Sequence, residues 1–277
     1  MGWRVTAAHH IHLIASDIDG TLVWRGVLPD RNRRALQRAQ AAGYKVVLAT
    51  VRKYSSAKEI ADLAGIACPL ICEGGATVYD DAGSCVRSIT IATDHMHSIA
   101  ATADDLGIPL LMTSDGVNYA TAGARSELSL FHADISVTHA PSARQIAATH
   151  AISRLIVAGA AEVTALSAAV AHLPLRIANH YTRAGVLDDA VITHIDATKE
   201  AAVTWWAAQH DWHWKHIMAC GDAEADLAMV QAAHIGVAPG NATAAVQAVA
   251  NWVGPLAEDG AVAAALAHFL QIDSQTE

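Results

Sequence analysis

The stretch Ile11–Thr21, IHLIASDIDGT, carries more information about this chain than any other of its length. Its apolar first half predicts a buried β-strand, and Gly20 ends that strand directly after two carboxylates, Asp17 and Asp19. In open α/β sheets, ligands bind in the crevice beyond the carboxyl ends of the strands. We therefore expect the two acids to serve a site there, the alternative being a solvated turn at the end of a strand.

Composition limits the classes of protein to which the chain can belong. Its 277 residues are 53% hydrophobic, which is enough for a substantial core in one large domain or two smaller ones. The formal charge is -9 and no basic run occurs, so neither nucleic acid nor an anionic membrane is expected as a partner. Without a secretory signal or a long apolar segment, a soluble cytoplasmic protein is expected, with its four cysteines reduced.

Strands and helices alternate along both ends of the chain. The segments with a strand pattern are 11–15, 44–49, 69–72, 216–220 and 235–238, and those with a helix pattern are 29–40, a segment with a capping box at Ser56 and Glu59, 198–209 and a segment from about 224. Such alternation predicts an α/β fold with a Rossmann-like parallel sheet covered by helices.

The middle of the chain follows a different pattern. After a predicted hairpin turn at 81–83, residues 84–194 mix strand patterns at 108–112, 117–120, 154–158 and 175–179 with helix patterns near 94–106, 141–150 and 160–171. We interpret residues 84–194 as a second, α+β domain inserted into a discontinuous core formed by residues 1–83 and 195–277.

Two further carboxylates point to a cation. Asp222 and Asp226 follow the strand at 216–220 and are spaced four residues apart at the start of a helix, so they can share one face. Together with Asp17 and Asp19 they would repel one another without a positive charge. Carboxylate oxygens from separate loops suit Mg²⁺, which keeps coordination places for water and phosphate. We therefore predict Mg²⁺ as the cofactor.

With that cation, the remaining polar residues at strand ends fit phosphoryl transfer. Asp17 can attack phosphorus and carry the phosphoryl group, while Asp19 can protonate the leaving oxygen and later activate water. Thr50 follows the strand at 44–49 and can donate its hydroxyl group to a phosphate oxygen. Lys199 opens the helix after the insert and can neutralise both nucleophile and phosphate.

At this point the sequence resembles the haloacid-dehalogenase superfamily, and within it the Cof-like sugar-phosphatase group with a large α+β cap of the C2 type. The motifs that carry the resemblance are Asp17-Ile18-Asp19-Gly20-Thr21, Leu48-Ala49-Thr50, Lys199, and Gly221-Asp222 with Asp226; loops at 71–76, 237–242 and 258–260 are also similar to those of the group. The resemblance covers nearly the whole chain.

The resemblance implies a site and an activity. Mg²⁺ would be held by Asp17, the backbone carbonyl of Asp19, and Asp222, and we add Asp226 to the candidate metal ligands. The candidates for binding the substrate phosphate are Thr50, Arg52, Lys199 and Gly20. The implied activity is hydrolysis of a small phosphate monoester, and Asn179, His180 and Arg183 of the insert are candidates for contact with the substrate.

Three positions depart from the pattern of the family. Val51 stands where the second motif usually has Gly, between Thr50 and Arg52, and a β-branched residue does not easily adopt positive φ. Ala225 and Gly74 both stand where Asn is common. Two other functions therefore stay open beside the phosphatase, a sugar phosphomutase and a non-catalytic protein that binds a phosphate ligand. A homo-oligomer also stays open.

Overall fold

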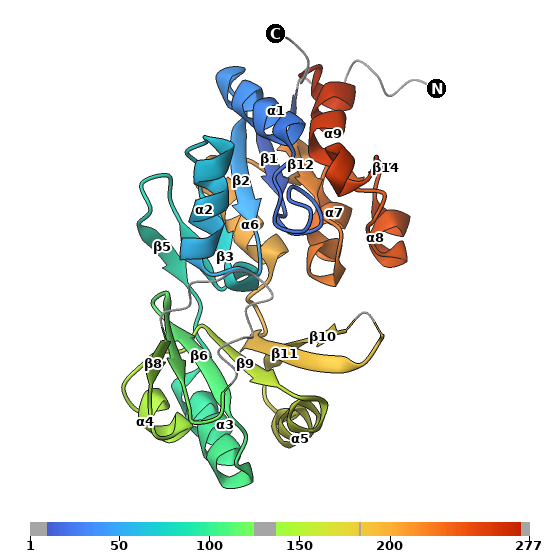
Figure 1. Cartoon of the computed structure of the whole chain (residues 1–277). Helices are drawn as coiled ribbons and strands as arrows, with labels where there is room; N and C mark the ends of the chain where they lie inside the picture. Colours follow the sequence, from blue (N-terminus) through green and yellow to red (C-terminus); the bar gives the residue numbers. More distant parts are fainter. Residues whose placement is uncertain (1–9, 125–136, 183, 273–277) are drawn as a thin grey trace. The chain divides into compact units, whose positions relative to one another are not determined.

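The structure is a computed structural model that describes residues 10–124, 137–182 and 184–272. The chain folds into two compact units. One, here called the core unit, consists of Met1–Val86 and Thr198–Glu277, and the other, here called the inserted unit, consists of Arg87–Ala197. In the chain, the inserted unit interrupts the core unit within its fifth strand, Cys85–Ser88 (Figure 1).

The core unit is built on an eight-stranded sheet with the order β14-β13-β12-β1-β2-β3-β4-β5. Every pair from β14 to β3 is parallel, and β4 pairs with β3 in the antiparallel direction. The predicted α/β fold with a Rossmann-like sheet is therefore confirmed. The strands are β1 (Leu13–Ser16), β2 (Lys45–Ala49), β3 (Leu70–Cys72), β4 (Thr77–Tyr79), β5 (Cys85–Ser88), β12 (Ile217–Cys220), β13 (Ile235–Ala238) and β14 (Trp252–Val253).

Helices cover both faces of this sheet because alternate strand residues point to opposite sides. Ile14 of β1 packs in one cluster with α1, α2 and α9, whereas its neighbours Leu13 and Ala15 pack in another with α6 and α7. The helices are α1 (Asp30–Ala41), α2 (Tyr54–Ala64), α6 (Lys199–Ala208), α7 (Leu227–Ala232), α8 (Ala244–Val249) and α9 (Ala261–Leu270).

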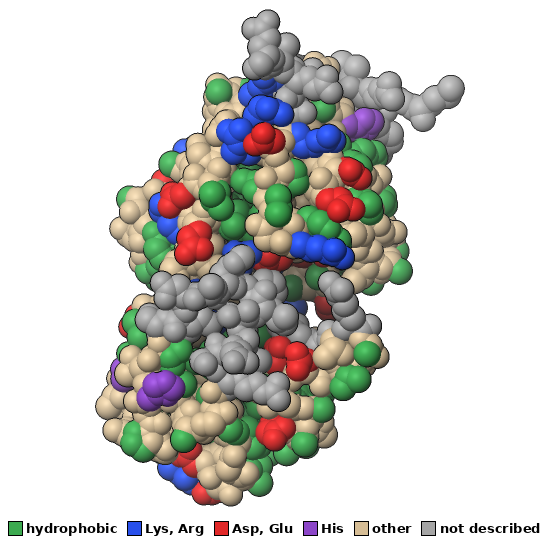
Figure 2. All heavy atoms as spheres, in the orientation of Figure 1, with side chains coloured by type: hydrophobic (Ala, Val, Ile, Leu, Met, Phe, Trp, Pro, Cys, Tyr) green, Lys and Arg blue, Asp and Glu red, His purple; other side chains and the backbone are tan. Residues whose placement is uncertain are grey.

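Helix α1 is rich in polar residues but packs on the sheet through one apolar face. It buries Asn32, Ala35, Leu36 and Ala39 and leaves its arginines at the surface, where Figure 2 shows basic side chains gathered over this end of the core unit. Helix α2 differs from the prediction. It begins at Tyr54 after Lys53, which caps it with no side-chain hydrogen bond, so the capping box expected at Ser56 and Glu59 is wrong.

The inserted unit contains a six-stranded sheet with the order β10-β11-β9-β6-β7-β8. One cluster of apolar side chains joins this sheet to its helices. The strands are β6 (Leu110–Ser114), β7 (Val117–Ala120), β8 (Val137–His139), β9 (Arg154–Ala158), β10 (Leu175–Tyr181) and β11 (Leu187–His194), and the helices are α3 (Thr93–Leu106), α4 (Ala143–Ala147) and α5 (Ala160–Val170). The sequence pattern did not predict β11, whose first residues include Asp188 and Asp189.

Two general properties of the described residues complete the fold. None of their helices combines the length and the hydrophobicity that are needed to cross a membrane. None of the four cysteines forms a disulfide bond within the described residues; Cys68, Cys72 and Cys220 are buried and Cys85 is exposed.

Parallel pairing brings the candidate site together. In the sheet register, Ser16 at the end of β1 lies opposite Cys220 of β12 on one side and Leu48 of β2 on the other. The residues that follow these strands, among them Asp17, Thr50 and Asp222, therefore emerge at the same edge of the sheet.

Candidate active site

The loop after β1 holds Asp17 at the centre of this edge. The backbone N–H of Asp17 donates to the carbonyl oxygen of Cys220 at 2.9 Å, and the residue is only 4% exposed. Gly20 has a φ of 82°, and a Cβ atom there would lie 2.3 Å from a carboxylate oxygen of Asp222. Only glycine therefore lets this loop pass so close to the carboxylate of Asp222.

Lys199 brings a buried ammonium group to the site. It begins α6 after Thr198, whose side chain caps the helix by accepting from the N–H of Ala201. Its Nζ donates to Oδ1 of Asp17 at 2.5 Å and to Oδ1 of Asp226 at 2.6 Å, and all three residues are buried. Burial by itself lowers the pKa of Lys199, but the two carboxylates outweigh burial and raise it above its ordinary value, so the ammonium stays charged.

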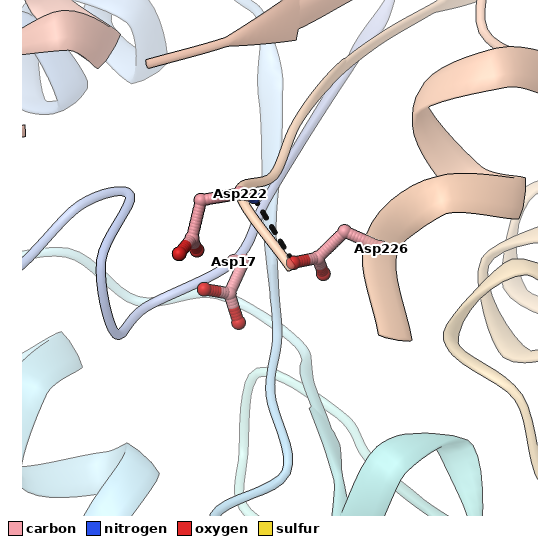
Figure 3. A group of neighbouring side chains, drawn as sticks. All are labelled: Asp17, Asp222 and Asp226. Atoms are coloured by element: carbon pink, nitrogen blue, oxygen red, sulfur yellow. Dashed lines mark hydrogen bonds between the residues drawn. The ribbon is translucent and has the colours of Figure 1, made fainter. Parts of the chain in front are cut away.

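Three carboxylates converge around this lysine. Asp17, Asp222 and Asp226 each offer an oxygen within 4.8 Å of the others, which makes them the one such group of three or more potential metal-binding side chains in the described parts of the chain (Figure 3). Burial, followed by the charge of Asp226, raises the pKa of Asp222 to about 6. Burial also raises the pKa of Asp17 well above its ordinary value, although Lys199 opposes this shift.

Lys199 contributes one positive charge to a cluster of three carboxyl groups. Hard oxygen donors that converge with excess negative charge fit a small divalent cation such as Mg²⁺. The three acids are not equivalent, however. Asp226 uses Oδ1 for Lys199 and Oδ2 to accept the backbone N–H groups of Asp222 and Ala223, both at 3.1 Å. Asp222 accepts from the hydroxyl group of Thr21, at 2.8 Å.

Asp19 has a different partner from the other acids. Its Oδ2 accepts from Nε of Arg52 and its Oδ1 from Nη2, both at 2.7 Å, in a two-point ion pair. The sequence placed Arg52 among the residues that bind the substrate phosphate. In the structure its guanidinium group instead contacts Asp19 and, through Nη1, the hydroxyl group of Ser56 at 3.0 Å.

Thr50 is fully buried directly after β2. The next residue, Val51, fits the loop because the backbone does not need positive φ there. Among the described residues, those other than glycine with positive φ do not include Val51, so the conflict expected from its β-branched side chain does not arise. Positive φ occurs instead in the turn after β3, at Glu73 (54°), Gly74 (70°) and Gly75 (108°).

That turn, Glu73–Gly75, ties two parts of the site together. Its first two N–H groups donate to the carbonyl oxygens of Arg52, at 2.8 Å, and of Thr50, at 3.0 Å. A Cβ atom on Gly75 would lie 2.1 Å from the carbonyl oxygen of Thr198, directly before Lys199. The turn belongs to the loop at 71–76 that is similar to one of the family, but the sequence does not predict these contacts, because nothing in a local pattern shows which backbone lies opposite.

The structure also locates the remaining candidates. Gly20 accepts a hydrogen bond at its carbonyl oxygen from the side chain of Asn241, at 2.8 Å, a residue that the sequence analysis included only as part of a loop. Asn179 is exposed on β10 of the inserted unit. Arg183 and the side chain of His180 lie outside the described residues.

Known proteins are similar to this chain in both sequence and fold. The family model described as haloacid dehalogenase-like hydrolase matches residues 14–266. The 5-amino-6-(5-phospho-D-ribitylamino)uracil phosphatase YcsE of Bacillus subtilis is 24% identical over 261 residues, which are 94% of this chain and 96% of that protein. The pyridoxal phosphate phosphatase YbhA of Escherichia coli is 28% identical over 269 residues, which cover 87% and 92% of the two chains.

Solved structures agree on the fold. BT1666 of Bacteroides thetaiotaomicron, described as a phosphatase of the haloalkanoate enzyme superfamily, superposes with a TM-score of 0.81 at 22% sequence identity. The match covers 97% of this chain and 98% of that one.

Proposed function

The chain belongs to the haloacid dehalogenase-like hydrolases, and from that premise we propose that it is a Mg²⁺-dependent phosphatase acting on a small phosphorylated metabolite, such as a sugar phosphate, through an aspartyl-phosphate. The resemblance found in the sequence is thereby confirmed at the level of the family. One observation carries the proposal further. The buried Lys199 joins Asp17 to Asp226 beside Asp222, at the carboxyl edge of a parallel sheet.

We assign the cation to Asp17, Asp222 and the backbone carbonyl of Asp19. Asp226 lies in the same cluster, but both of its oxygens already accept hydrogen bonds, Oδ1 from Lys199 and Oδ2 from the backbone N–H groups of Asp222 and Ala223. Its role in the proposal is therefore to fix the lysine and the loop. When bound, Mg²⁺ would supply charge that draws the phosphate to the nucleophile and stabilises its oxygens.

The first step is attack on the ester. A carboxylate oxygen of Asp17 forms a bond to phosphorus as the bond from phosphorus to the leaving oxygen breaks. The electron pair of the broken bond goes to the leaving oxygen, which takes a proton from the carboxyl group of Asp19. Lys199 and the hydroxyl group of Thr50 stabilise the charge on the transferring group. The alcohol departs, and residue 17 carries the phosphoryl group.

The second step returns the enzyme to its starting state. A water oxygen attacks phosphorus and gives a proton to the Asp19 carboxylate. The bond from phosphorus to Asp17 breaks, and its electron pair restores the carboxylate. Inorganic phosphate leaves, so that both aspartates have completed a cycle.

The purified protein tests this directly. It should release inorganic phosphate from a generic aryl phosphate when Mg²⁺ is present, and should not do so in excess chelator. A panel of phosphorylated metabolites would identify the substrate, and it should include the two compounds for which YcsE and YbhA are named. Isomerised sugar phosphate without net phosphate release, seen by phosphorus NMR, would point to a phosphomutase instead.

The inserted unit has a proposed role in substrate selection. We assign selection of the leaving group to this unit, Arg87–Ala197, which interrupts the catalytic core along the chain, and we place the protein in the cytoplasm. Substitutions in this unit should change the ratio of kcat/KM between two phosphate esters, while activity toward a minimal aryl phosphate stays within about threefold of wild type.

A further inference from the structure

Arg52 is buried more deeply than the carboxylate that it contacts. Its side chain is 1% exposed, whereas that of Asp19 is 24% exposed. Nε and Nη2 donate to the two oxygens of Asp19, and Nη1 donates to Ser56 in the first turn of α2. The guanidinium group thus contacts Asp19 from the buried interior, while part of the Asp19 side chain stays exposed.

The backbone of Arg52 is anchored as firmly as its side chain. Its N–H donates to Oγ1 of Thr50 at 3.1 Å, and its carbonyl oxygen accepts from the N–H of Glu73 at 2.8 Å. Contacts on the backbone and on all three guanidinium nitrogens leave this side chain little freedom to turn toward a substrate.

We propose that Arg52 is a positioning residue that acts through Asp19 and does not bind the substrate phosphate. The inference rests on the proposed function, because it concerns the proton transfers assigned to Asp19. Each carboxylate oxygen has two lone pairs, so Arg52 can donate to one lone pair on each oxygen of Asp19. The catalytic proton can then bind at, and leave from, one of the remaining lone pairs. The planar fork of the guanidinium group fixes both oxygens at once, and a lysine in its place cannot do this.

With an activated aryl phosphate as substrate, only one of the two proton transfers assigned to Asp19 affects the rate. Its leaving group departs without a proton, so phosphorylation of Asp17 hardly needs Asp19. Hydrolysis of the aspartyl-phosphate still needs Asp19 as a base. Loss of Arg52 should therefore slow the second step alone, and phosphorylated protein should accumulate.

The experiment compares Arg52→Lys with wild type in Mg²⁺ and an activated aryl phosphate. We expect kcat to fall about 10- to 100-fold and kcat/KM to stay within about threefold of wild type. A stoichiometric burst of aryl alcohol should precede the steady state, and intact mass spectrometry after acid quench should detect the phosphorylated protein. Arg52→Gln, whose amide can still donate to one oxygen of Asp19, serves if the lysine variant does not fold.

Arg33→Lys is the matched control. Arg33 also donates through Nε and Nη2 to an aspartate, Asp30, but this pair is exposed on α1. The control should show no burst and unchanged constants.

Two results at residue 52 would overturn the inference. Equal falls in kcat and kcat/KM without phosphorylated protein would mean that Arg52 binds the transferring phosphoryl group, and unchanged kinetics would mean that the ion pair has no part in the reaction. Wild-type protein that releases no phosphate from any ester would refute the proposed function itself, and the inference with it, whatever stands at residue 52.

Discussion

Asp222 and Asp226 should respond to neutralisation with opposite changes in stability. Both are acids of one loop, and each change to asparagine removes one negative charge from the same cluster. Their contacts differ, however, because Asp226 holds the buried lysine and Asp222 does not. Comparing Asp226→Asn with Asp222→Asn therefore separates what specific contacts contribute to the free energy of unfolding from what net charge contributes.

Asp226→Asn should destabilise the protein. The amide can direct its oxygen toward Lys199 or toward the two backbone N–H groups, but its NH₂ group then faces donors on the other side. Breaking a buried ion pair costs roughly 3–5 kcal/mol. Relief of repulsion with Asp17 and Asp222 returns part of this, so we expect a net loss of about 2–4 kcal/mol in the free energy of unfolding.

Asp222→Asn should stabilise the cation-free protein. The pKa of Asp222 is about 6 in the folded protein against an ordinary value of 3.8, so the folded state binds the proton more tightly than the unfolded chain does. Stability is then lost as pH rises from about 4 to about 6 and stays lost at pH 8. At about 1.4 kcal/mol per pKa unit, the neutral side chain recovers up to about 3 kcal/mol, and its oxygen can still accept from Thr21.

Urea unfolding at pH 8 in chelator provides the assay. The six tryptophans of the described residues, Trp24, Trp205, Trp206, Trp212, Trp214 and Trp252, all belong to the core unit, so tryptophan fluorescence follows the unit that contains the site. Added Mg²⁺ should stabilise wild type and Asp226→Asn but should hardly affect Asp222→Asn, which lacks a proposed ligand. Equal shifts of the same sign for both variants would refute the reasoning, because net charge alone would then explain them.

Three further predictions follow from the same site. Asp17→Asn should abolish phosphate release at saturating Mg²⁺, and activity that persists would exclude Asp17 as the nucleophile. Because the pKa of Asp222 is about 6, protons should compete with the cation, so the apparent affinity for Mg²⁺ measured by titration calorimetry should be constant above pH 7 and weaken as pH falls through 6. Gly75→Ala should cost roughly 1–3 kcal/mol more in unfolding free energy than Gly74→Ala, and should lower kcat. Both positions have positive φ, but only the Cβ at 75 meets the carbonyl of Thr198, and equal losses would contradict this account.

Local patterns predicted elements where the periodicity of the sequence was clear. The strand pattern at 154–158 coincides with β9, and the helix pattern at 160–171 with α5 at Ala160–Val170. The pattern failed for β11, where Asp189 is buried and interrupts the apolar run of the strand. Burial of such a residue depends on partners from other strands, which a local pattern does not contain.

Val51 shows the same limit within the site. Comparison with the motif of the family suggested that the loop needs positive φ at this position. In the structure positive φ occurs instead at Glu73 and the two glycines after it, in a turn that follows β3 and whose N–H groups donate to the carbonyl oxygens of Thr50 and Arg52. The conformation of a loop is thus set by the backbone that lies against it, and Val51 adopts negative φ.

From the sequence alone came the family, the parallel α/β core, and the order in which the acids, Thr50 and Lys199 follow strands or begin a helix. The family came from the resemblance of the motifs, whereas the core and the order of the polar residues need only the hydrophobic period and the spacing along the chain, because parallel strands bring their carboxyl ends to one edge. The partners of the charges were decided only by tertiary structure. Arg52 pairs with Asp19 across 33 residues of chain, and Lys199 with Asp17 across 182. Such pairs depend on side-chain direction and burial to within an ångström, and both are properties of the packed protein.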